Sequence, residues 1–85
     1  MLRRHEDELR NRIEAVNHKG FAFIEWWELK QWYSMQRLGK SVWRDLRERF
    51  DEDEELTGVK VYPTENGVLF IDGNKLESLS EWTSD

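Results

Sequence analysis

The chain has 85 residues, an aromatic share of 13% and a net charge of −5, which is enough for one domain with a modest core built from a few large rings. It has no cysteine, which excludes disulfide crosslinks and thiolate chemistry. No stretch approaches the roughly 18 apolar residues of a transmembrane helix, and the N-terminus lacks the apolar run of a signal peptide. We therefore expect a single cytoplasmic domain over residues 1–85, without membrane contact.

The charge is divided unevenly along the chain. Residues 1–50 hold 11 Lys and Arg against 8 Asp and Glu, a balance of +3, whereas residues 51–85 hold 2 against 10, a balance of −8. A basic half is a condition for binding nucleic acid but does not establish such binding. Ordinary variation in surface charge explains the asymmetry equally well.

The N-terminal third is predicted to form a helix followed by an extended segment. A helix over Leu2–Val16 is expected because apolar side chains recur on one helical face, at Leu2, Leu9, Ile13 and Val16. Gly20 suits the left-handed residue that follows a helix. The segment Phe21–Phe23 alternates large, small and large side chains, which favours a short strand or connector with both rings in the core.

Two short amphipathic helices, joined by a turn at Arg37–Lys40, are predicted between Glu25 and Phe50. The first begins near Ile24 or Glu25 and has an apolar stripe of Trp26, Leu29, Trp32 and Tyr33. The second, with Ser41 as its expected cap, has a stripe of Val42, Trp43, Leu46 and Phe50. Two such stripes around a glycine-containing turn are typical of a helix-turn-helix, which serves DNA binding and protein binding alike.

The C-terminal third is predicted to contain a β-hairpin. The acidic run Asp51–Glu55 is unfavourable at a helix C-terminus, so the preceding helix is expected to end there. Val59–Tyr62 and Val68–Ile71 are two strand-forming runs, and the loop Pro63–Gly67 between them contains an Asn-Gly pair. In the tail, apolar residues recur every third position, as in a short terminal helix laid on the core: Leu76, Leu79 and Trp82.

The order helix, short strand, helix, turn, helix and hairpin resembles the winged-helix family over Leu2–Gly73. The stretch RLGKSVWRDLRERF is similar to the turn and recognition helix of such domains, and VKVYPTENGVLFID stands where the family has its wing. The resemblance implies a small α+β winged helix: three helices, a two- or three-stranded antiparallel β-hairpin wing and a short C-terminal segment.

The resemblance further implies that the helix at 41–50 enters the major groove of double-stranded DNA, as in a small stand-alone transcriptional regulator. Arg44 is the side chain best suited to a base edge, because a guanidinium binds guanine in bidentate fashion. Negative side chains nearby (Asp45, Glu48 and Glu65) weaken the local positive field, and a homodimer reading two half-sites would compensate by doubling the contacts. The expected DNA contacts are Arg37, Lys40, Ser41, Arg44, Arg47 and Lys60.

An alternative function is a winged helix used for protein contact. Trp27 is predicted to face away from the apolar stripe, on the side of Gln31 and Met35, which makes these three residues a candidate protein-contact patch. Packing of Trp27 under the first helix or a terminus is an equally good interpretation. A variant of this alternative is an acidic inhibitor that occupies a partner's nucleic-acid site with its Asp51–Glu55 surface.

The sequence contains no constellation expected of an enzyme. His5 and His18 lie at opposite ends of one predicted helix and have no cysteine or suitably spaced carboxylate for a metal site. Gly39-Lys40-Ser41 lacks the preceding glycine and strand that a phosphate-binding loop requires. We therefore expect no enzymatic activity, no metal, no cofactor and no small-molecule substrate.

Overall fold

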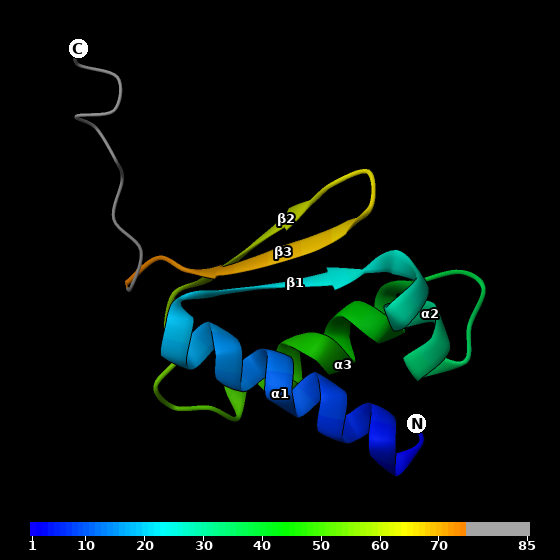
Figure 1. Ribbon diagram of the computed structural model, residues 1–85, viewed down its shortest axis with the longest axis horizontal. Coiled ribbons are helices and arrows are strands. Elements are labelled where there is room, and N and C mark those ends of the chain that lie inside the picture. The colour runs from blue at the N-terminus through cyan, green and yellow to red at the C-terminus, as the bar shows by residue number, and fades with distance from the viewer. Residues whose placement is uncertain (75–85) are drawn as a thin grey trace.

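The computed structural model describes residues 1–74 (Figure 1). The elements in chain order are α1 (Arg3–Lys19), β1 (Phe21–Glu25), α2 (Trp26–Tyr33), α3 (Lys40–Asp51), β2 (Val59–Pro63) and β3 (Gly67–Asp72). The expected α+β fold of three helices with a C-terminal β-hairpin is confirmed. The tail residues for which a terminal helix is predicted, Leu76, Leu79 and Trp82, lie outside the described residues.

The three strands form one antiparallel sheet in the order β1-β3-β2. The hairpin predicted around the Asn-Gly loop is confirmed, and its second strand is the centre of the sheet. Leu69 on β3 pairs with Phe23 on β1 and with Tyr62 on β2. The short segment after α1 therefore joins the hairpin, and the wing is a three-stranded sheet.

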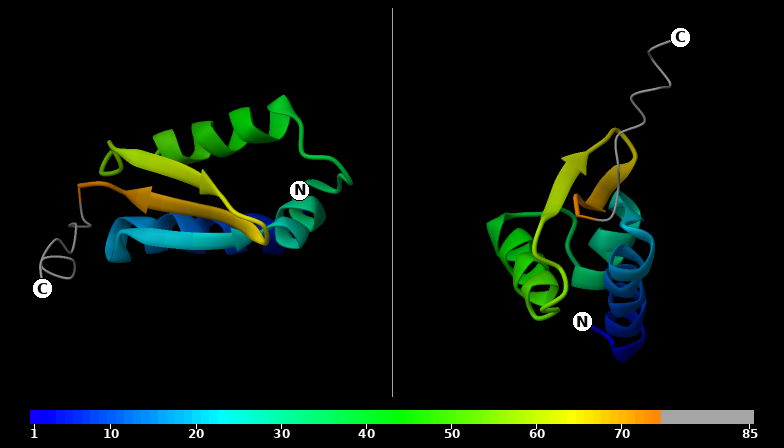
Figure 2. Two further views of the ribbon diagram at one scale, coloured as in Figure 1. Left: turned by 90° about the horizontal axis from the view of Figure 1, so that it is seen from above. Right: turned by 90° about the vertical axis from the view of Figure 1, so that its left-hand side faces the viewer.

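All three helices lie on one side of the sheet (Figure 1), with α1 beneath β1 and α3 toward β2 (Figure 2). The core between the helices and the sheet contains the apolar stripes predicted for the two central helices. Leu29, Val42, Leu46 and Phe50 are buried, and Phe50 stacks on Phe70 of β3 with ring centroids 4.8 Å apart. None of the helices within residues 1–74 is long and apolar enough to cross a membrane.

The expectation that the rings of Phe21 and Phe23 enter the core is wrong. Because side chains alternate along a strand, the inward positions of β1 are taken by Ala22 and Ile24, which are 5% and 0% exposed. The two rings instead lie on the outer face of the sheet, where Phe21 and Phe23 are 47% and 38% exposed. No other element within residues 1–74 covers this outer face (Figure 1).

Both ends of α1 differ from the predicted ends, and Gly20 terminates the helix. The helix starts one residue after Leu2, which is exposed, and it continues three residues past Val16 to Lys19. Gly20 then adopts the left-handed conformation at φ 91°, and its N–H donates to the carbonyl of Val16. This residue turns the chain into β1, as expected for a glycine after a helix.

The caps of the two central helices also differ from the predicted ones. Ser41 does not cap α3: Gly39 is the N-cap, no side chain caps this end, and Ser41 is the second helical residue. The α2 helix begins at Trp26, one to two residues later than expected, and is capped by Glu25. The Glu25 carboxylate accepts from the backbone N–H of Glu28, and the Glu28 carboxylate accepts from that of Glu25, which is a reciprocal capping box.

Candidate nucleic-acid interface

Three cations on α3 form a stripe along one side of the helix, here called the α3 stripe: Lys40, Arg44 and Arg47. At 100° per residue these positions fall within about 60° of arc and span about 10 Å of helix. All three side chains are exposed, and none forms an ion pair with another side chain within residues 1–74. Their positive charges are therefore available to an anionic partner.

Asp45 does not share the exposed face of this stripe, contrary to the expectation from sequence. Its Oδ2 accepts a hydrogen bond of 2.6 Å from the Tyr33 hydroxyl of α2 and one of 2.8 Å from Nε of Arg49. Arg49 in turn lies 3.9 Å from a Glu6 carboxylate oxygen of α1. The carboxylate of Asp45 is thus held on the side of α3 that faces α1 and α2, and its charge is compensated there.

These contacts also determine the protonation states of Tyr33 and Asp45. Partial burial raises the pKa of Asp45, but the hydrogen bonds from Tyr33 and Arg49 outweigh it, so the pKa lies below its ordinary value. Burial, the hydrogen bond to Asp45 and the negative charge of Asp45 together hold the pKa of Tyr33 well above its ordinary value. At neutral pH the pair therefore consists of a neutral phenol and an ionised carboxylate.

Trp26 positions the wing relative to α3. Its Nε1 donates to the carbonyls of Thr64 and Glu65, at 3.0 and 3.1 Å, which ties the tip of the β2–β3 loop to the start of α2. The Trp26 ring also meets the Trp43 ring of α3 edge to face, with centroids 6.2 Å apart. One side chain thus links the loop, α2 and α3, and sets the relative position of helix and wing.

The other predicted DNA contacts are distributed unevenly around the stripe. Arg37 is exposed in the connection before α3. Ser41 is exposed on the first turn of α3, but it lines a pocket with Tyr33 and Asp45, away from the stripe. Lys60 also lies away from the stripe: it alternates with Val59 and Val61, which face α3, so its side chain lies on the outer face of the sheet. The wing loop contributes the exposed Glu65 and no cation.

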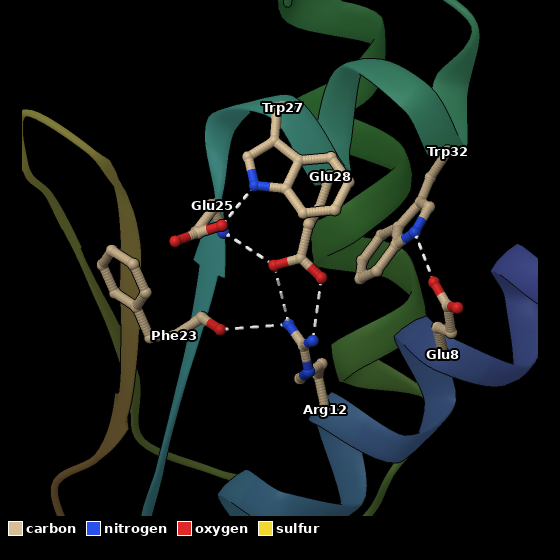
Figure 3. A network of polar contacts seen from close by, with 7 residues as sticks. All are labelled: Glu8, Arg12, Phe23, Glu25, Trp27, Glu28 and Trp32. Carbon is tan, nitrogen blue, oxygen red and sulfur yellow. Dashed lines mark hydrogen bonds and ion pairs between the residues drawn. The ribbon is translucent and has the colours of Figure 1, made fainter.

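A second polar network, drawn in Figure 3, holds α1, β1 and α2 together. Arg12 of α1 reaches both carboxylate oxygens of Glu28 on α2, at 3.2 and 2.8 Å, and donates to the carbonyl of Phe23 on β1 at 3.1 Å. Its guanidinium also lies 5.7 Å from the ring centroid of Trp32, whose Nε1 donates to Glu8 at 2.8 Å. Burial opposes ionisation of Glu28, but the bonds from Arg12 and the Glu25 backbone lower its pKa.

The candidate protein-contact residues are all exposed. Trp27 is 61% exposed and its Nε1 donates to the Glu25 carboxylate, while its ring points outward from α2 (Figure 3). Gln31 follows one turn later on the same helix, and Met35, 42% exposed, lies beyond the end of α2. Met35 lines a shallow pocket with Met1, Tyr33 and Ser41, at the start of α3.

Residues 1–74 contain no group of three or more His, Cys, Asp or Glu side chains placed to hold a metal ion. Comparisons with protein-family models, with curated proteins and with solved structures find no match.

Proposed function

We propose that the protein is a small DNA-binding protein of the winged-helix type that presents α3 to the major groove of double-stranded DNA. A transcriptional regulator is the corresponding biological role. The single observation that carries the proposal is the α3 stripe: Lys40, Arg44 and Arg47 are exposed, lie on one side of the helix after the turn, and lack internal ion-pair partners within residues 1–74.

The contacts of Asp45 support this proposal further. In the sequence, Asp45 reduces the expected positive field of the helix, but its bonds to Tyr33 and Arg49 draw it away from the stripe. Arg44 remains the side chain proposed to contact a base edge, and Lys40 and Arg47 the ones proposed to contact phosphates. With so few cations, each monomer makes few phosphate contacts, so high affinity requires two copies on adjacent half-sites.

The test is a chemical-shift titration of the isotope-labelled protein with a short duplex of random sequence at about 50 mM salt, where electrostatic binding is strong. The proposal expects the largest shifts at Arg37–Arg47 and small ones at Phe21 and Lys60, on the outer face of the sheet. Shifts confined to the outer face, or none at all, would overturn it.

A second candidate function, a protein-interaction module, is favoured by a different observation. Two separate aromatic surfaces are exposed: Trp27 on α2 at 61%, and Phe21, Phe23 and Tyr62 on the sheet at 47%, 38% and 48%. Aromatic side chains that are this exposed are typical of surfaces that contact other proteins. An acidic inhibitor acting through Asp51–Glu55 is a variant of the same candidate.

A further inference from the structure

A groove of about 530 Å³ lies between α3 and β2. Its size falls within the range of about 300–1,000 Å³ typical of small-molecule sites. The stacked pair of Phe50 and Phe70 lies in it, and Val61 of β2 faces it while remaining 49% exposed. Its apolar lining comes mainly from Trp43, Leu46, Phe50, Val59, Val61 and Phe70.

Two opposite charges stand beside this apolar lining. Arg47 and Asp51 both line the groove from α3, one helical turn apart, which places their Cβ atoms about 5–6 Å from each other. Both are exposed, and neither forms an ion pair or side-chain hydrogen bond with another residue within 1–74. A cation and an anion at this spacing complement a ligand that has one carboxylate and one ammonium group.

We propose that this groove binds a free α-amino acid with a large apolar side chain. Arg47 binds the carboxylate, Asp51 binds the ammonium group, and the apolar side chain enters between Trp43 and Val61. The groove has the volume of a small-molecule site, and an apolar compound without charges would leave both Arg47 and Asp51 without a ligand group to bind. This binding does not require that the protein binds DNA.

One consequence of amino-acid binding rests on the proposed DNA-binding function. Arg47 belongs both to the groove and to the α3 stripe, so an amino acid bound to it competes with a DNA phosphate for the same guanidinium. In a DNA-binding protein the groove is therefore an effector site, at which the amino acid weakens the complex with DNA.

Calorimetric titrations of the full chain with three probes, in the absence of DNA, test the site. L-Tryptophan has both charged groups, indole-3-propionate has only the carboxylate, and tryptamine has only the ammonium group. L-Tryptophan is expected to bind with a dissociation constant of about 0.5 mM, the order expected for roughly fifteen non-hydrogen atoms. Each of the other two probes is expected to bind about tenfold more weakly, because it loses one charge-assisted contact.

Two variants separate the charged contacts. Arg47→Gln should weaken L-tryptophan and indole-3-propionate about tenfold and leave tryptamine unchanged, whereas Asp51→Asn should weaken L-tryptophan and tryptamine and leave indole-3-propionate unchanged. Arg4→Gln and Glu54→Gln make the same charge changes at exposed positions outside the groove and should have no effect. Val61→Trp, which fills the groove, should abolish binding of all three probes.

Several results would overturn the assignment. These are no saturable binding of L-tryptophan below roughly 10 mM, equal weakening of all three probes by either variant, or unchanged binding in Val61→Trp. Sedimentation that shows a dimer broken by Val61→Trp would assign the groove to a second copy of the chain. Because the titrations contain no DNA, a failure of DNA binding leaves their outcome unaffected.

Discussion

The Tyr33 hydroxyl donates a hydrogen bond of 2.6 Å to Oδ2 of Asp45, across the junction of α2 and α3. Asp45 would otherwise oppose the positive charge of the α3 stripe. Through this bond and the one from Arg49, the acid contributes to the packing of α3 against its neighbours. The same contact therefore stabilises the helix pair and holds Asp45 away from the stripe, while Glu48 and Asp51 stay exposed one helical turn from Arg44 and Arg47.

Loss of this bond should destabilise the fold. Tyr33→Phe keeps the ring and removes the hydroxyl, and we expect it to lower the free energy of unfolding by about 1 kcal/mol. Urea unfolding followed by circular dichroism measures the change. Tyr62→Phe is the matched control, because Tyr62 is 48% exposed on the sheet and should change the stability by less than about 0.5 kcal/mol. Equal effects of the two substitutions would contradict the role of the bond.

Acid should weaken the fold through Asp45 and Glu28. The pKa values of both carboxyls are lowered in the folded protein, so the stability they contribute is present above their unfolded pKa, near 4, and is lost as the pH falls through the lower folded pKa. We expect Asp45→Asn and Glu28→Gln each to reduce stability at pH 7 and to reduce the difference in stability between pH 7 and pH 2. A variant as acid-sensitive as the wild type would show that its carboxylate contributes nothing.

Arg12 should contribute more to the stability of the fold than Arg10, which lies two residues earlier on the same helix. Its side chain is 33% exposed, and the Glu28 side chain it pairs with at 2.8 Å is 13% exposed, whereas Arg10 is 69% exposed and lies 3.8 Å from Asp7. Arg12→Met leaves Glu28 without its partner and should cost about 1–3 kcal/mol. Arg10→Met should cost at most about 0.5 kcal/mol. Thermal unfolding of the two variants gives the comparison, and a reversed order would contradict the network.

Two of the three tryptophans of α2, Trp27 and Trp32, should differ in their contribution to stability. Trp27 is 61% exposed and Trp32 is 1% exposed. Trp27→Ala should leave the fold nearly as stable as the wild type, while Trp32→Ala should cost about 3–5 kcal/mol. If the protein-contact candidate is correct, Trp27→Ala also removes self-association or capture of a partner, measured by sedimentation and pull-down. A Trp27→Ala variant that is folded and binds its partner unchanged would eliminate Trp27 as a contact.

Much of this fold is readable from local pattern. The apolar spacing of Val42, Leu46 and Phe50 identifies the inner side of α3, and the Asn-Gly loop identifies the hairpin. The orientation of Phe21 and Phe23 is not predictable from local pattern, because the alternation of side chains in β1 does not determine which face of the strand packs against the helices. That choice depends on pairing with β3, which is more than forty residues away in the sequence.

The site is only partly predictable for the same reason. Lys40, Arg44 and Arg47 follow from helical periodicity, and the pair of Asp45 and Arg49 has the i,i+4 spacing that sequence can reveal. The hydrogen bond of Asp45 to Tyr33 crosses between two helices, and Arg12 meets Glu28 across sixteen positions. No periodicity predicts either contact, although these contacts decide which charges stay free.

A salt titration tests the central claim, that the α3 stripe binds DNA, most directly. Affinity for random duplex DNA, measured by fluorescence anisotropy from about 50 to 200 mM salt, should fall with a slope in log K of about −0.9 per phosphate contact, or about −2 for the contacts proposed for Lys40 and Arg47. The double variant Lys40→Gln, Arg47→Gln should remove most of that slope, and the charge-matched control Arg4→Gln, Arg10→Gln should leave it unchanged. Absence of binding at the lowest salt, or the same loss of slope in both double variants, would contradict the claim.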